Sequence, residues 1–179
     1  RQSIFAFKGD VYLGLQAESL SPRDLNFAQK NLRILSGLYG LLRPLDLIKP
    51  YRLEMGTQLE NKRGGDLYDF WQDAIAEAIK SEFGNSKNPH LINLASNEYF
   101  KAVDLEQLKG VRVINPVFKD TSNGQLKIIS FYAKRARGLM AQYIIKQRLT
   151  QPEKLKSFDV DGYRYHPDLS SDRDWVFAR

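Results

Sequence analysis

Three long segments place apolar residues at the spacing of an α-helix. The segment 22–32 begins with a proline, and it follows Ser21, a capping serine that has Asp24 three residues after it. The segment 66–84 begins with a capping aspartate after two glycines, and the segment 133–149 ends shortly before a Gln-Pro pair. The pattern therefore predicts three amphipathic helices.

Shorter apolar runs, bounded by glycine, proline or asparagine, predict strands between these helices. The segments 111–119 and 125–132 flank Asn123-Gly124, a pair that favours a tight reversal, so we expect a β-hairpin there. A short helix is expected over 95–99, directly after a strand. The other predicted strands are 4–7, which is followed by a turn at 8–10, and then 33–36, 91–94, 163–165 and 175–177.

These elements mix helices with short strands and a β-hairpin, which indicates a mixed α/β (α+β) fold. A chain of 179 residues, of which 42% are hydrophobic, can bury a substantial core, so we expect a single compact domain over 1–179. The chain opens at Arg1 and reaches an apolar run almost at once, so we expect that an N-terminal segment is missing. No run is long enough to cross a bilayer and none resembles a signal peptide, which favours a soluble protein without a membrane partner.

The sequence contains no cysteine, which excludes disulfides, thiol chemistry and iron–sulfur ligation and fits a cytoplasmic location. Its two histidines, His90 and His166, do not have a metal-binding spacing, so we predict no metal site and no cofactor. The common nucleotide-binding and hydrolase motifs are absent as well.

The net charge of +6 is unevenly distributed along the chain. Between Gln125 and Lys156 there are eight Lys or Arg residues and a single acid, Glu153. The remainder of the chain is therefore close to neutral. A concentrated basic region of this kind indicates a polyanionic partner.

Within the basic region, Lys134, Arg135 and Arg137 stand at the start of the predicted helix 133–149. Cations at a helix N-terminus oppose the helix dipole, so we expect them to bind an external anion rather than to stabilise the helix. Tyr132 precedes them as a possible stacking partner for a base. A solvated cationic face is the alternative interpretation.

A second candidate is the apolar segment 32–54, in which Gly37 and Gly40 bracket Leu-Tyr. Glycine lets the backbone approach a partner closely, and Arg43 and Arg52 can each place two donors on a phosphate. We interpret these four residues as a polar rim that faces an anion. The alternative is that the leucines of this segment simply build an irregular part of the core.

Several acids stand beside glycine or aromatic residues, and Asp10 and Glu54 are the candidates for acid/base catalysis. The alternative is structural, with Asp10 in a turn and Glu54 in an ion pair with Arg52. An enzyme that acts on nucleic acid or on a phosphorylated small molecule would use these acids, with Ser36, Tyr39 and Arg43 around the anion. Since no catalytic motif is present, enzymatic activity stays open and we lean against it.

Several ordered blocks run along nearly the whole chain. The blocks are Phe7-Lys8-Gly9-Asp10-Val11-Tyr12, Leu35-Ser36-Gly37-Leu38-Tyr39-Gly40, Leu42-Arg43-Pro44-Leu45-Asp46, Pro50-Tyr51-Arg52-Leu53-Glu54-Met55-Gly56, Asn93-Leu94-Ala95-Ser96 and Ile129-Ser130-Phe131-Tyr132-Ala133-Lys134, with Ala136-Arg137-Gly138 after them. Together these blocks resemble the bacterial YaaA family of peroxide stress resistance proteins.

The resemblance implies a cytoplasmic protein of unusual α/β fold that limits oxidative DNA damage and free intracellular iron. It also implies a basic cleft and a helix-hairpin-helix-like element that bind DNA, largely without sequence specificity and including distorted or bubble-containing duplexes. We place the hairpin on 37–44 and the basic cleft on Lys134, Arg135 and Arg137, with Arg43 and Arg52 as further candidates. DNA, most simply double-stranded DNA, is thus the expected partner, and no obligate protein partner is inferred.

Overall fold

The computed structural model describes all 179 residues, and its internal contacts divide the chain into two compact units. Unit 1 comprises Arg1–Ala6, Leu32–Pro89 and Ala95–Arg112, and unit 2 comprises Phe7–Asn31, His90–Leu94 and Val113–Arg179. Both units contain helices, and strands with mixed pairing occur in the chain, which confirms the predicted mixed α/β class. That the two units form one domain stays a prediction.

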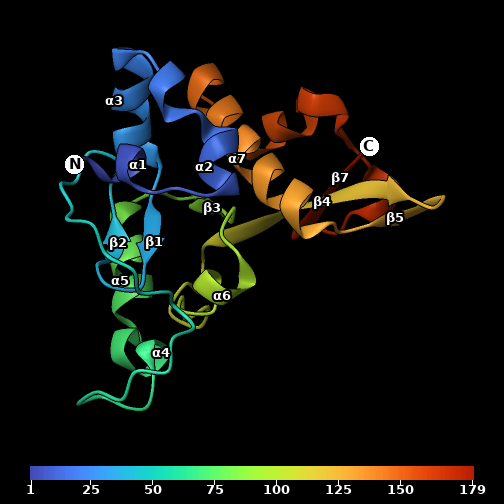
Figure 1. Cartoon of the computed structure of the whole chain (residues 1–179). Coiled ribbons are helices and arrows are strands. Elements are labelled where there is room, and N and C mark those ends of the chain that lie inside the picture. Colours follow the sequence, from blue (N-terminus) through green and yellow to red (C-terminus); the bar gives the residue numbers. More distant parts are fainter. The chain divides into compact units, whose positions relative to one another are not determined.

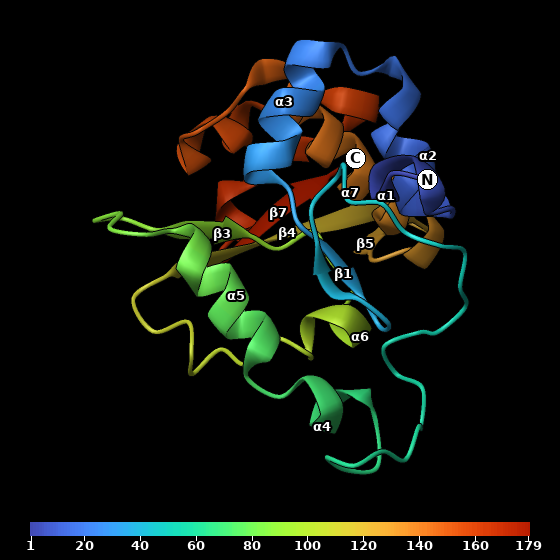
Figure 2. The same cartoon turned by 90° about the vertical axis from the view of Figure 1, so that its left-hand side faces the viewer.

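Unit 1 is organised around a short antiparallel hairpin. Strand β1 pairs with β2 so that Ser36 lies opposite Gly40, and helix α5 contacts β2 while α6 contacts β1 (Figure 2). Buried apolar side chains from the hairpin, α4 and α5 form its core. The elements of this unit are α1 (Ser3–Ala6), β1 (Ile34–Ser36), β2 (Gly40–Leu42), α4 (Leu67–Trp71), α5 (Ala74–Glu82) and α6 (Asn97–Phe100).

Unit 2 contains a sheet with the strand order β3-β4-β7-β6, and β5 pairs with the distal part of β4. Strands β4 and β7 are parallel, whereas β6 and β7 are antiparallel. Its helices are α2 (Asp10–Leu15), α3 (Pro22–Asn31) and α7 (Ser130–Gln147), with 3-10 turns η1 (Ala17–Ser19), η2 (Pro152–Ser157), η3 (Val160–Gly162) and η4 (Pro167–Leu169). Its strands are β3 (His90–Ile92), β4 (Arg112–Ser122, which begins at the last residue of unit 1), β5 (Gln125–Lys127), β6 (Arg164–Tyr165) and β7 (Asp174–Ala178).

Helix α7 is the centre of unit 2. One of its faces joins β4, β7 and η2 in an aromatic-rich core, and α2 and α3 contact α7 as well (Figure 1). Helix α2 crosses α7 at Gly14 and Gly138, where a Cβ atom on Gly138 would overlap the carbonyl oxygen of Val11. The two helices therefore pack backbone to backbone, which only glycine permits.

Most of the elements predicted from local signals are confirmed. Ser21 and Asp24 form the expected reciprocal cap, since each backbone N–H is donated to the other residue's side chain (3.1 and 3.2 Å). The side chain of Asp66 accepts the N–H of Asp69 at the start of α4. Asn123 and Gly124 both have positive φ values, as a tight hairpin turn requires.

Four local predictions are wrong. The run 4–7 is not a strand, because residues 3–6 form α1. The turn predicted over 8–10 is one residue too long, because Asp10 is the first residue of helix α2. The helix predicted over 66–84 is interrupted at Gln72, whose φ of 41° ends α4 before α5 begins. The second hairpin strand ends at Lys127, and α7 begins at Ser130 rather than at residue 133.

Candidate nucleic-acid interface

Gly37 lies in the turn between β1 and β2, and Gly40 is the first residue of β2. The N–H of Tyr39 is donated to the hydroxyl of Ser36 across this turn (3.0 Å), and the Trp71 indole N–H is donated to the carbonyl of Gly37 (2.9 Å). Because strands flank the turn on both sides, the prediction of a helix-hairpin-helix-like element over 37–44 is wrong.

Both glycines are buried, and another residue of unit 1 packs closely against each of them. A Cβ atom on Gly37 would lie 2.6 Å from the carbonyl oxygen of Leu53, and one on Gly40 would lie 2.7 Å from the Trp71 ring. Gly40 also has a φ of 72°, which favours glycine. These contacts account for the two glycines by packing within unit 1.

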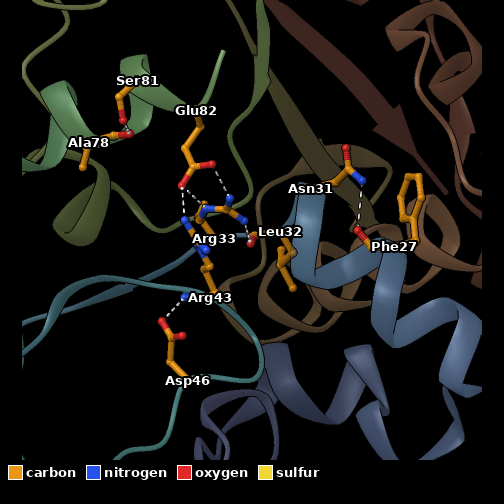
Figure 3. A network of polar contacts seen from close by, with 9 residues as sticks. All are labelled: Phe27, Asn31, Leu32, Arg33, Arg43, Asp46, Ala78, Ser81 and Glu82. Atoms are coloured by element: carbon orange, nitrogen blue, oxygen red, sulfur yellow. Dashed lines mark hydrogen bonds and ion pairs between the residues drawn. The ribbon is translucent and has the colours of Figure 1, made fainter. Parts of the chain in front are cut away.

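Arg43, a predicted anion-binding residue, shares one carboxylate with Arg33 (Figure 3). Glu82 accepts two hydrogen bonds from Arg33, at 2.6 and 3.2 Å, while Arg43 approaches it at 3.4 Å and keeps more than half of its side chain exposed. The hydrogen bond from Arg33 is the main reason that the pKa of Glu82 is lowered. Two guanidinium groups against one carboxylate leave this cluster with a net positive charge.

Arg52 and Glu54 are exposed on the chain that follows β2, and they form no ion pair with each other. The structural alternative for Glu54 is therefore wrong. Glu54 instead lies near the Tyr99 phenol. Burial is the main cause that raises the pKa of this phenol, and the nearby Tyr51, Glu98 and Glu54 raise it further. Arg52 is left as a cation of unit 1 without an ion-pair partner.

The three predicted cations of unit 2 lie on α7. Lys134 and Arg135 are exposed and Arg137 is half-buried, and none of the three side chains forms a hydrogen bond or an ion pair. Burial lowers the pKa of the Arg137 guanidinium, which has thus lost water without gaining a counter-charge. Since α7 starts at Ser130, these residues follow its first turn, and the argument from the helix dipole does not apply to them.

The two candidates for acid/base chemistry belong to different units. Asp10 is the first residue of α2 in unit 2, and Glu54 belongs to unit 1. The carboxylates whose pKa is shifted are Asp24 and Glu82, and hydrogen bonds lower the pKa of both, which holds them as anions. A general acid at neutral pH needs the opposite shift.

Ser36 and Tyr51 share a hydrogen bond of 2.5 Å inside unit 1. Burial raises the pKa of the Tyr51 phenol, so the phenol stays protonated at neutral pH and cannot activate the serine. Tyr39, the other candidate of the enzyme hypothesis, accepts the N–H of Lys49 through its hydroxyl. The Ser36–Tyr51 pair therefore supports the hairpin turn through its hydrogen bonds.

Comparison with known proteins assigns this chain to a family. Residues 1–169 match the family model described as "Peroxide stress protein YaaA". The chain belongs to this family. Curated relatives named "UPF0246 protein" are 59% identical in Cellvibrio japonicus, 60% in Ralstonia pickettii and 56% in Dechloromonas aromatica. Each match covers the whole of this chain and 69% of the relative.

Membership of the YaaA family supports a role in peroxide stress for this chain, as the sequence blocks predicted. None of its helices combines the length and the apolar character needed to span a membrane. No group of three His, Asp or Glu side chains is positioned to hold a metal ion.

Two polar clusters of this YaaA-family chain were missed from the sequence. Arg33 pairs with Glu82 across 49 positions, and no local signal marks either residue as part of a pair. In unit 2, Asp120 is almost fully buried and accepts hydrogen bonds from the Tyr163 hydroxyl (2.9 Å) and from Nε of Arg179 (2.5 Å). Asp120 continues the buried alternation of β4 near the end of the strand, beyond the predicted strand 111–119, so no local signal marked it.

Proposed function

We propose that this YaaA-family chain exerts its role in peroxide stress by binding DNA, largely without sequence specificity. The observation that carries the proposal is the state of Lys134, Arg135 and Arg137. Three neighbouring cations have no counter-charge within the protein, and one of them is partly removed from water. A phosphate backbone supplies the missing negative charge without requiring any contact to a base.

The chemistry of the chain favours indirect protection. These 179 residues contain no cysteine, so they offer no thiol that could reduce peroxide or sense it. Protection through the DNA itself needs only the cations, and Arg43 and Arg52 of unit 1 are further candidates for phosphate contacts. The resemblance to the family adds an expected decrease in free intracellular iron, which we include in the proposal.

The salt dependence of DNA binding tests the proposal. Fluorescence anisotropy of a labelled duplex, measured across a salt series, should give a steep fall in affinity. Replacing Lys134, Arg135 and Arg137 with alanine should weaken binding to all sequences alike and reduce the magnitude of the log–log slope by about 2 to 3. An unchanged slope would overturn the assignment of these residues.

A matched triple variant controls for net charge. Lys62, Lys80 and Lys87 are exposed lysines of unit 1, and their replacement with alanine removes the same charge. This variant should keep most of the salt slope. An equal loss in both triple variants would show that net charge alone, rather than the α7 cations, determines the binding.

A further inference from the structure

We propose that the start of α7 is a stacking platform for unpaired nucleotides, with Phe131 as the residue that receives the base. The proposal rests on the proposed DNA-binding function and adds a ligand class, since it distinguishes unpaired strands from duplex. It adds an exposed aromatic surface to the α7 cations that the phosphate-binding proposal uses.

Large apolar side chains are exposed where β5 passes into α7. Phe131 is 52% exposed and Tyr132 is 42% exposed, and Ile128 and Leu126 are exposed just before them. The rings of Phe131 and Tyr132 meet edge to face, with their centres 5.7 Å apart. Contiguous exposed apolar side chains are typical of interaction surfaces, whereas single scattered ones are not.

The two rings have different surroundings. The guanidinium of Arg179 lies 5.0 Å from the centre of the Tyr132 ring, so one side of this ring is already occupied. The ring of Phe131 contacts no other aromatic ring and no cation. Tyr132 thus supports Phe131 from the side, and Phe131 offers the free face.

The cations beside the platform are positioned by the helical repeat. Arg135 follows Phe131 by four residues and Tyr132 by three, and Lys134 follows Phe131 by three, so all lie on one side of the first two turns. Lys127 at the end of β5 adds a further exposed cation. From Gln125 to Leu149 the chain contains no acidic residue.

A flat apolar ring surrounded by cations matches the chemistry of an unpaired nucleic-acid strand. Phosphates bind the cations, while bases stack on the ring, and stacking needs no particular base. A duplex keeps its bases stacked on each other, so it can use the cations but not the ring. An anionic membrane surface could also accept a basic aromatic patch, and it is the alternative that the experiment must separate.

The test uses the 179-residue chain, a labelled single-stranded oligo(dT) and a labelled duplex of the same length. Replacement of Phe131 with alanine should weaken oligo(dT) binding about fivefold or more and change duplex binding less than about twofold. Phe131→Tyr should retain most of the oligo(dT) affinity. Leu169→Ala removes another exposed apolar side chain of unit 2 and should have no effect on either probe.

Phe131→Trp provides a direct signal of stacking. Oligo(dT) should quench the added tryptophan fluorescence, after subtraction of the signal from Trp71 and Trp175, and the duplex should not. The platform is overturned if Phe131→Ala leaves oligo(dT) binding unchanged, or if it weakens both probes equally.

The outcomes separate the two proposals. If the wild-type chain binds duplex with a steep salt dependence while Phe131→Ala has no effect, the platform fails and the proposed function stands. If neither probe binds, the proposed function fails. Binding to phosphatidylglycerol vesicles that depends on Phe131, without oligo(dT) binding, would assign the surface to a membrane and overturn the platform.

Discussion

The carbonyl oxygen of Val11 occupies the space that a side chain at Gly138 would need. Alanine at position 138 must therefore push α2 away from α7, and neither helix backbone can move aside as a side chain can. The gain in helix propensity is at most about 1 kcal/mol. We expect Gly138→Ala to lower the free energy of unfolding by about 1–3 kcal/mol, measured by urea denaturation.

Gly65→Ala provides the control for this substitution. No atom lies within 4 Å of a Cβ at Gly65, and its φ is not positive. The free energy of unfolding of the Gly65→Ala variant should differ from that of the wild-type chain by less than about 0.5 kcal/mol. Equal stability of the Gly138→Ala variant and the wild-type chain would contradict the tight packing of α2 on α7.

Asp120 is expected to stabilise unit 2 through its buried carboxylate. Asp120→Ala removes the acceptor for Tyr163 and for Nε of Arg179, although Arg179 keeps Asp161 as a partner at 2.7 Å. The loss should be about 2 kcal/mol, measured by thermal or urea unfolding. Asp168→Ala replaces an exposed acid of η4 and should leave the free energy of unfolding almost unchanged. A similar loss of stability in this variant would contradict the special role of Asp120.

Glu82 makes unit 1 sensitive to acid. The pKa of Glu82 is lowered, first by its hydrogen bond to Arg33, from an ordinary value of 4.5. Its contribution to stability is therefore complete above about pH 4.5 and is lost as the pH falls through the lower value of the folded state. Because the cluster is partly exposed, the contribution should be less than about 1 kcal/mol.

Urea denaturation between pH 3 and pH 7 can detect this contribution. Glu82→Gln should reduce the fall in stability on acidification, while its stability at low pH approaches that of the wild-type chain. A parallel shift of the whole curve would mean that the carboxylate is not the titrating group.

Ser36 and Tyr51 should be energetically coupled. Ser36 is fully buried and holds both the Tyr51 hydroxyl and the N–H of Tyr39. Ser36→Ala should cost about 1–3 kcal/mol, since it leaves a backbone N–H of the turn without its acceptor. In a double-mutant cycle with Tyr51→Phe, a coupling energy of at least about 0.5 kcal/mol is expected, and additive effects would refute the pairing.

The sequence was most informative where the signal and its effect lie within a few residues. The caps at Ser21 and Asp66 and the Asn123-Gly124 turn could be predicted because their hydrogen bonds are local. Helix α1 could not, because its residues are fixed from a distance. The Ser3 hydroxyl donates to the carbonyl of Arg43, 40 positions away, and a helix of four residues is too short to show a periodicity.

The candidate site follows the same division. The cations of α7 were found because they are consecutive in the sequence, although the start of their helix was misplaced by three residues. The partnership of Arg43 with Glu82 and Arg33 was not found, because it depends on how α5 packs beside the hairpin. The packing role of Gly37 and Gly40 was also invisible, since their neighbours Leu53 and Trp71 are identified only by the fold.

The division of the chain into interleaved pieces determines how it can fold during synthesis. Helix α2 precedes its partner α7 by more than a hundred residues, and β7, which lies between β4 and β6 in the sheet, follows both of these strands in the sequence. Unit 2 therefore closes only after β7 has left the ribosome. Truncation at the C-terminal side removes β7 from between β4 and β6, so the cations and Phe131 have to be examined by point substitution in the 179-residue chain.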